Sequence, residues 1–157
     1  MKKAYSISEL INFAVEIEKQ GALFYENMAK RTTNESVRKL YEFLKAEELI
    51  HRHKYQEMLN KVDSAANDEH IYTDEYHQYL NSMVESIVFR KDEVFQNKLT
   101  KDNEVIDYAI IKEKESILLY MEMRLMIKPE QQSIVDEIIK EEKSHIVKLL
   151  DLKQKVA

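Results

Sequence analysis

Cysteine is absent from the 157-residue chain, and glycine and proline occur once each. Without cysteine the chain cannot form disulfides, thiolate-bound iron–sulfur clusters or cysteine nucleophiles. Any redox chemistry must therefore use oxygen and nitrogen ligands or a bound organic cofactor. With so little glycine and proline, strands joined by tight turns lack their usual turn residues, and we predict an all-α protein.

Long apolar runs and a basic charge balance are also missing. The apolar residues after Met1 are interrupted by Glu9 and Glu16, which excludes a signal-peptide core, and no apolar run is long enough to span a membrane. The formal net charge of −5 offers no basic surface for nucleic acid. We therefore expect a cytoplasmic protein with no nucleic-acid or membrane partner. The length matches a single domain over residues 1–157.

Four long segments carry apolar residues at helical spacing, and they group into two helical hairpins. Hairpin one covers residues 6–62 and begins at Ser6, which can form a capping box with Glu9. Hairpin two covers residues 102–155, and Pro129 suits the first position of its second helix. We predict a four-helix bundle built from these hairpins. The helices are expected at about 6–31, 34–62, 102–127 and 129–155.

A long crossover over residues 63–101 joins the two hairpins. Residues 63–73 carry no helical stripe and are rich in Asp, Asn, Ser and Ala, so we expect a surface loop there. Thr73 and Asp74 then start a short additional helix, and an irregular or weakly helical return follows. A crossover of this length can carry the chain from one end of a bundle to the other.

Six ionisable residues interrupt the apolar stripes of the bundle helices. A charge that faces a core is unfavourable unless it is paired or coordinates something. Glu48 with His51, and Glu142 with His145, form two Glu-x-x-His pairs. Residues three apart on a helix share one face, with Cβ atoms about 5–6 Å apart, so each carboxylate and imidazole can reach one metal ion. The six residues are Glu18, Glu48, His51, Glu113, Glu142 and His145.

The distance of each carboxylate from the nearest turn places all four at one level of the bundle. Glu18 lies 15 residues before a turn centred near Thr33, and Glu48 lies 15 residues after it. At 1.5 Å per residue, each carboxylate is about 22 Å from the turn. Glu113 and Glu142 lie symmetrically about position 127.5, where the second turn is expected.

The second hairpin repeats residues of the first. Four residues of the first helix recur 95 positions later, and three residues of the second helix recur 94 positions later. Packing the hairpins about a pseudo-twofold axis brings the six ionisable residues together, where four unpaired carboxylates would repel and resist ionisation. Two divalent ions would neutralise them, and a hydrogen-bonded polar layer without metal is the alternative. The repeated residues are Ala14, Glu18, Lys19 and Tyr25 with Ala109, Glu113, Lys114 and Tyr120, and Glu47, Glu48 and His51 with Glu141, Glu142 and His145.

Neighbours of the six residues are not expected to bind metal. Glu47 lies off the apolar stripe and is expected to point outward or sideways. Replacing Glu16 or Glu141 is expected to leave the metal bound. Gly21, one turn from Glu18, is interpreted as a close-packing position.

One Glu from each of two helices, with a Glu-x-x-His from each of the other two, is the ligand set of the ferritin-like carboxylate proteins. Within that superfamily the sequence resembles the diiron domain of rubrerythrin. The resemblance covers the four bundle helices and implies a ferritin-like four-helix bundle. It rests on Glu18 followed at +7 by Tyr25, Glu113 followed at +7 by Tyr120, Glu48-x-x-His51 and Glu142-x-x-His145.

The resemblance also implies a cofactor and a role for each residue. The cofactor would be two iron ions per chain, with manganese or a mixed metal pair as alternatives. Tyr25 and Tyr120 would hydrogen-bond carboxylates of the site and are the catalytic candidates, with core aromatics as the alternative reading. The implied bridging ligands are Glu48 and Glu142, the terminal ligands Glu18 and Glu113, and the histidine ligands His51 and His145.

The sequence departs from the family pattern in two respects. Rubrerythrins carry an extra Glu three residues after the ligand at the position of Glu113, where this chain has Ser116. Full-length rubrerythrins also hold iron on four Cys in a small domain, which a chain without cysteine cannot provide. Electrons would therefore come from an external donor such as a rubredoxin-like protein.

Three functions are compatible with these residues. The first is a rubrerythrin-like oxidoreductase that reduces hydrogen peroxide or dioxygen with electrons from the external donor, in defence against oxidative stress. The second is an iron-binding or ferroxidase protein for iron storage or delivery. The third is a non-catalytic bundle that binds or senses metal. We expect a homodimer.

Overall fold

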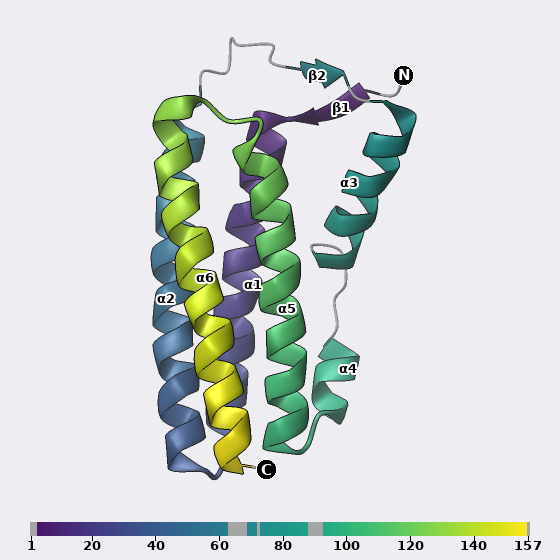
Figure 1. The fold of residues 1–157 in the computed structure, drawn as a ribbon. Coiled ribbons are helices and arrows are strands. Elements are labelled where there is room, and N and C mark those ends of the chain that lie inside the picture. The colour runs from purple at the N-terminus through teal and green to yellow at the C-terminus, as the bar shows by residue number, and fades with distance from the viewer. Residues whose placement is uncertain (1–2, 63–68, 72, 88–92, 157) are drawn as a thin grey trace.

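Four long helices form a bundle in the computed structural model, which describes residues 3–62, 69–71, 73–87 and 93–156. Two helices of each hairpin lie side by side, and the hairpins pack against one another (Figure 1). The all-α bundle of two hairpins that the sequence predicts is confirmed. The helices are α1 (Ile7–Arg31), α2 (Glu35–Lys61), α5 (Asp102–Arg124) and α6 (Pro129–Val156).

Side-chain caps set the limits of the first hairpin. Ser6 accepts a hydrogen bond from the Glu9 backbone N–H at 3.1 Å, and the Glu9 carboxylate accepts one from the Ser6 N–H at 2.7 Å. This reciprocal pair is the predicted capping box. Asn34 caps α2 by accepting hydrogen bonds from the N–H groups of Ser36 and Val37. The turn between α1 and α2 is therefore short, and its position fixes the offset of the two helices along the bundle axis.

The second hairpin turns earlier than the sequence predicts. Helix α5 ends at Arg124, three residues before the expected limit, because the Leu125 and Met126 N–H groups bond to carbonyls three residues back, at 3.1 and 3.0 Å. Arg124 also holds the turn closed by bonding the carboxylate of Asp136 on α6. Pro129 is the first residue of α6, as expected, since its missing N–H needs no helical partner there.

The crossover packs beside α5 and contains two short helices, α3 (Asp74–Ile87) and α4 (Glu93–Lys98) (Figure 1). It also contains strand β2 (Glu69–Ile71), which pairs antiparallel with strand β1 (Lys3–Ser6). The expected surface loop over residues 63–73 is therefore wrong in part. These strands are too short to show a period-two pattern, and their pairing joins distant parts of the chain. Residues 63–68, 72 and 88–92 lie outside the described residues.

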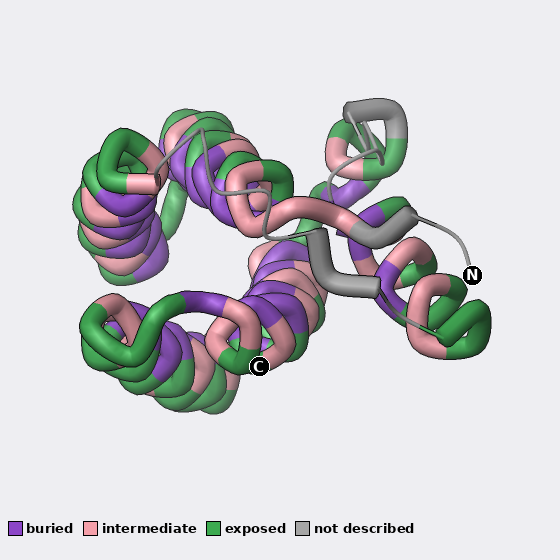
Figure 2. Tube along the Cα trace, turned by 90° about the horizontal axis from the view of Figure 1, so that it is seen from above, coloured by how far each residue is buried: buried purple, intermediate pink, exposed green. Residues whose placement is uncertain are grey.

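The buried faces of the four long helices point into the middle of the bundle, as the view from above shows (Figure 2). The buried apolar residues form two main clusters, one containing Ile11, Tyr120 and Ile138, the other containing Met28, Tyr41 and Leu149. Along every long helix, the ionisable residues lie between the residues of one cluster and those of the other. They are Glu18, Glu48, His51, Glu113, Glu142 and His145. The bundle thus has an apolar core at each end and a polar layer between them.

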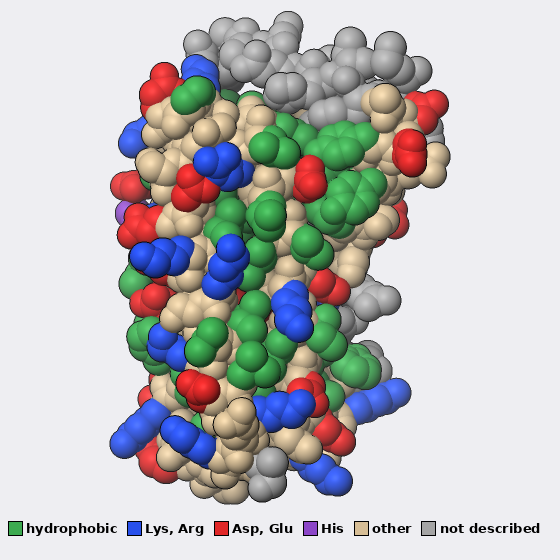
Figure 3. Space-filling view, in the orientation of Figure 1, with side chains coloured by type: hydrophobic (Ala, Val, Ile, Leu, Met, Phe, Trp, Pro, Cys, Tyr) green, Lys and Arg blue, Asp and Glu red, His purple; other side chains and the backbone are tan. Residues whose placement is uncertain are grey.

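The outer surface of the bundle is mixed in character. Apolar side chains are visible among charged ones over α5 and α6 (Figure 3). Helix α5 is apolar on more than one side, which explains why it carries both buried and exposed large apolar residues. No helix in the described part of the chain is long and apolar enough to cross a membrane. The exposed large apolar residues of α5 and α6 are Ile111, Leu118, Met121, Val147 and Leu150, and Leu125 in the turn between these helices is also exposed.

Candidate metal centre

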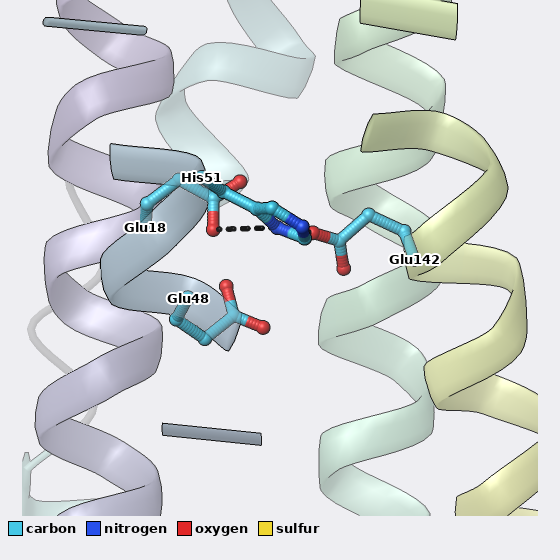
Figure 4. A group of neighbouring side chains, drawn as sticks. All are labelled: Glu18, Glu48, His51 and Glu142. Atoms are coloured by element: carbon cyan, nitrogen blue, oxygen red, sulfur yellow. Dashed lines mark ion pairs between the residues drawn. The ribbon is translucent and has the colours of Figure 1, made fainter. Parts of the chain in front are cut away.

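The structure brings all six ionisable residues of the apolar stripes into one buried layer. None is more than 5% exposed. The side chains of Glu18, Glu48, His51 and Glu142 converge from α1, α2 and α6 (Figure 4). Each long helix contributes one carboxylate, and α2 and α6 each add an imidazole one turn further on.

His51 contacts carboxylates with both of its ring nitrogens. Its Nδ1 lies 2.7 Å from Glu142 Oε1 and 3.6 Å from Glu18 Oε2, inside the layer. Its Nε2 lies 2.6 Å from Glu141 Oε2, at the outer edge. The imidazole of α2 therefore reaches α1 and α6 at once.

His145 occupies the matching position in the second hairpin. Its Nδ1 lies 3.3 Å from Glu142 Oε2, 3.6 Å from Glu48 Oε1 and 3.7 Å from Glu113 Oε2. Its Nε2 is 3.8 Å from Glu47 Oε2. Glu142 thus directs one oxygen toward each imidazole.

Two tyrosines tie the hairpins together through the carboxylates. The Tyr25 hydroxyl on α1 donates a hydrogen bond of 2.5 Å to Glu113 Oε1 on α5. The Tyr120 hydroxyl on α5 donates one of 2.5 Å to Glu18 Oε1 on α1. Each tyrosine therefore orients a carboxylate of the other hairpin. In its own helix, each tyrosine lies about two turns after the Glu of the layer.

Many polar atoms of this layer have no hydrogen-bond partner among the described residues. Buried polar groups are nearly always paired, so a group of unpaired ones needs a cause. The atoms face one another across the layer, and carboxylate oxygens with imidazole nitrogens suit hard or borderline divalent ions. The residues therefore fit a metal. The unpaired atoms are Glu18 Oε2, Glu48 Oε1, His51 Nδ1, both carboxylate oxygens of Glu142, and both ring nitrogens of His145.

The ligand atoms form two overlapping groups. In each group, one atom from every residue lies within 4.8 Å of the others. Glu48 and Glu142 belong to both groups, so their carboxylates can serve two ion positions at once. The first group is Glu18, Glu48, His51 and Glu142, and the second is Glu48, Glu113, Glu142 and His145.

Burial and crowding make three of the four carboxylates of the layer resist ionisation. Burial raises the pKa of Glu18 to about 7, and the charge of Glu113 adds to the rise. Burial, followed by the neighbouring carboxylates, also raises the pKa values of Glu48 and Glu142. Glu113 is the exception: burial alone would raise its pKa, but contacts with Glu142 and His145 outweigh burial and lower it.

The same surroundings favour the protonated, charged form of the imidazoles. Burial alone would lower the pKa of His145, but contacts with Glu113, Glu142 and Glu48 outweigh burial and raise it to about 12. Burial is likewise outweighed at His51, mainly by Glu142, so its pKa is raised. Protons held on these groups supply the positive charge that the carboxylates need, and a divalent ion can replace them.

Glu47 and Glu141 are closer to the site than the sequence reading suggests. Both are partly buried, and each faces the outer ring nitrogen of a histidine on the opposite helix. Their recurrence in the internal repeat, 94 positions apart, was the signal for this role. Position on the helix alone does not predict these contacts, because they depend on how the outer edge of α2 packs beside the outer edge of α6.

Gly21 is the close-packing position that the sequence predicts. A Cβ atom at this residue would lie 3.2 Å from Glu48 Oε2, tighter than an ordinary contact. The space is continuous with a cavity of about 70 Å³ lined by residues of α1, α2 and α5, as well as crossover residues, among them Tyr25, Glu48, Glu113 and Ser116. The cavity therefore reaches two carboxylates of the layer, and the Ser116 hydroxyl donates a hydrogen bond of 3.0 Å to the Lys112 carbonyl.

Comparison with known proteins places this geometry in context. The family model described as Rubrerythrin matches residues 9–153. A solved structure from Thermotoga maritima, described as a ferritin-like diiron-carboxylate protein, is 24% identical, with 100% of both chains covered and a TM-score of 0.79. No curated protein matches the chain. The family resemblance and the ferritin-like fold that the sequence predicts are both confirmed.

Proposed function

The chain belongs to the rubrerythrin family, and we propose that it is a di-iron protein that reduces hydrogen peroxide or dioxygen with electrons from an external donor. The observation that carries the proposal is the sharing of Glu48 and Glu142 between two groups of ligand atoms. Two ions per chain follow if each group holds one. Oxygen and imidazole donors without thiolate favour iron or manganese.

The six residues would bind the ions as two overlapping sets of ligands. Glu18 and His51 would complete one ion position and Glu113 and His145 the other, with Glu48 and Glu142 available to both. When bound, two ferrous ions supply Lewis acidity and the two electrons that, with two protons, convert hydrogen peroxide into two molecules of water. The four ionised carboxylates would balance the charge of two divalent ions, and the two neutral imidazoles would add ligand atoms without charge.

The remaining residues of the site orient ligands and admit the substrate. Tyr25 and Tyr120 fix Glu113 and Glu18 through hydrogen bonds, so each terminal carboxylate keeps one oxygen for a metal. The cavity beside Gly21 is about 70 Å³, enough for a molecule of the size of peroxide. The apolar clusters on either side of the layer limit entry of bulk water.

A second candidate function is iron oxidation for storage or delivery. The absence of cysteine favours it, because these 157 residues contain no thiolate-bound iron that could return electrons to the site. A protein of this kind would oxidise ferrous iron repeatedly and accumulate ferric iron. A peroxidase would instead hold its two ions and consume an external reductant.

Stopped-flow mixing separates the two functions. Protein loaded with two ferrous ions per chain and kept anaerobic is mixed with one equivalent of hydrogen peroxide or, separately, dioxygen. We expect the di-iron absorption of the oxidised site to form faster with peroxide. Equal or slower oxidation by peroxide would contradict the peroxidase proposal.

Turnover experiments test the external donor. A rubredoxin-like protein with its reductase should raise peroxide consumption to many equivalents per site, and Glu113→Ala should abolish it while Glu16→Ala retains it. Growth of an iron core far beyond two ions per chain in a large assembly would favour storage. Native mass spectrometry of the same samples measures whether the protein is the expected homodimer.

A further inference from the structure

We propose that Glu141 is a positioning residue that fixes the proton and the orientation of His51, and that the two ion positions differ because Glu47 does not hold His145 in the same way. The inference rests on the proposed di-metal site. The contacts that carry it lie at the outer edge of the polar layer, where α2 meets α6. Glu47 and Glu141 lie at this edge, and neither is a proposed metal ligand.

The His51 ring lies between two consecutive residues of α6. Its Nε2 is 2.6 Å from Glu141 Oε2, within hydrogen-bond distance, and its Nδ1 is 2.7 Å from Glu142 Oε1. The Glu141 side chain is 32% exposed and the Glu142 side chain 1%, so the imidazole connects the partly exposed edge to the buried interior.

Chemistry assigns the direction of the outer contact. An ionised carboxylate only accepts hydrogen bonds, so Glu141 requires a proton on His51 Nε2. In a neutral imidazole the lone pair then lies on Nδ1, the nitrogen that faces Glu18 and Glu142. A histidine that binds metal commonly donates its other N–H to a carboxylate, which fixes the ring and raises its basicity as a ligand.

Lys54 holds Glu141 in place. Its Nζ lies 3.8 Å from Glu141 Oε2 and 3.7 Å from Glu137 Oε1. Lys54 follows His51 by one turn on α2, so Glu141 of α6 contacts two residues on the same face of α2. This arrangement places the Glu141 carboxylate between the Lys54 ammonium and the His51 imidazole.

The second half of the repeat has the same residues but different contacts. Lys148 stands where Lys54 does, 94 positions later, yet its Nζ bonds Ser144 Oγ at 2.7 Å and lies over the Phe43 ring. Glu47 Oε2 is 3.8 Å from His145 Nε2, too far for a hydrogen bond, and that nitrogen has no hydrogen-bond partner among the described residues. The His145 imidazole is therefore less constrained than the His51 imidazole.

A separate metal site at this edge is the competing interpretation. Glu47, His51 and Glu141 place ligand atoms within 4.8 Å of one another. However, the outer nitrogen of His51 is already engaged by Glu141, and the Lys54 ammonium beside that carboxylate opposes a further cation. Positioning of His51 therefore fits the contacts better than a third ion does.

Cobalt titration of the metal-free protein tests the proposal without using activity. Bound Co²⁺ is followed by visible absorption, which reports ligand geometry, and total metal is measured in parallel. For the unaltered protein we expect two equivalents with unequal affinity. Glu141→Ala should weaken one equivalent by about 10- to 100-fold and shift its absorption. Glu141→Gln, whose amide oxygen still accepts a hydrogen bond, should restore much of the affinity.

The internal repeat supplies matched controls. Glu47→Ala should change both affinities less than Glu141→Ala does, and Lys148→Met less than Lys54→Met. Circular dichroism of each metal-free variant verifies folding. Two equivalents bound by Glu141→Ala with unaltered affinity and absorption would overturn the positioning role while leaving the di-metal site intact. A third equivalent lost in both Glu variants would overturn it in favour of an outer metal site. Fewer than two equivalents in the unaltered protein would instead contradict the proposed function.

Discussion

The imidazole rings of His51 and His145 stack across the bundle, with centroids 5.6 Å apart and planes inclined by 17°. The rings come from α2 and α6, which belong to different hairpins, so their near-parallel arrangement reflects the pseudo-twofold relation between the repeats. Glu142 faces both, at 2.7 Å from His51 Nδ1 and 3.3 Å from His145 Nδ1. A change at this carboxylate therefore affects both halves of the site.

Replacement of the shared carboxylates should remove both metal ions. We expect Glu48→Ala and Glu142→Ala to lower bound iron from two ions per chain to nearly none, because each change removes a ligand from both positions. Elemental analysis after anaerobic loading and desalting measures the ratio. Glu16→Ala is the control, since Glu16 lies outside both groups of ligand atoms. Retention of one ion in both shared-carboxylate variants would show that the positions are filled independently.

The metal-free protein should lose stability between about pH 4.5 and pH 7. The Glu18 pKa is 4.5 in its ordinary state and about 7 in the fold, so the folded state keeps a proton that the unfolded chain releases. The stability from this group is complete below pH 4.5 and is lost as the pH rises through 7. The rise corresponds to roughly 3 kcal/mol in the free energy of unfolding. The raised pKa values of Glu48, Glu142 and His145 act in the same direction.

Thermal melts of the metal-free protein at pH 5 and pH 7.5 measure this trend. Glu113 acts in the opposite sense, because its lowered pKa adds stability above pH 4.5 that is lost as the pH falls. Manganous or ferrous ion should reverse the decline toward neutral pH, since it binds the deprotonated carboxylates of the folded state. A melting temperature that is insensitive to either ion would favour the polar layer without metal.

Removing the Tyr120 hydroxyl should destabilise the bundle. Tyr120→Phe leaves Glu18 Oε1 without its 2.5 Å hydrogen bond, and we expect a loss of about 1–3 kcal/mol in the free energy of unfolding. Tyr55 provides a matched control, because its hydroxyl is buried and has no hydrogen-bond partner among the described residues. Tyr55→Phe should therefore be neutral or stabilise by about 1 kcal/mol. Urea denaturation of both variants makes the comparison, and equal losses would contradict it.

A methyl group at Gly21 should separate folding from metal binding. Gly21→Ala favours the helix by about 1 kcal/mol, but its Cβ would meet Glu48 Oε2 at 3.2 Å and displace the carboxylate. We expect the metal-free protein to retain its melting temperature within a few degrees while cobalt affinity falls. Isothermal titration calorimetry measures the affinity. Unchanged affinity would mean that Glu48 has room to move without leaving the ions.

Helical periodicity and the internal repeat are sufficient to predict the layer of ionisable residues. The rise of a helix is constant, so counting residues from each turn places Glu18 level with Glu48, and Glu113 level with Glu142. The same counting places Glu48 one turn from His51. These relations depend on local geometry alone, and the structure reproduces the convergence that they imply.

The contacts between helices depend on tertiary structure. Nothing in the spacing of Tyr25 and Glu18 within α1 says that the hydroxyl bonds Glu113 of the other hairpin, or that Glu141 reaches His51. The difference between 2.6 Å at Glu141 and 3.8 Å at Glu47 likewise arises between equal residues of the repeat. Periodicity assigns a residue to a face, whereas hydrogen bonding is decided by fractions of an ångström in the rotation and offset of packed helices.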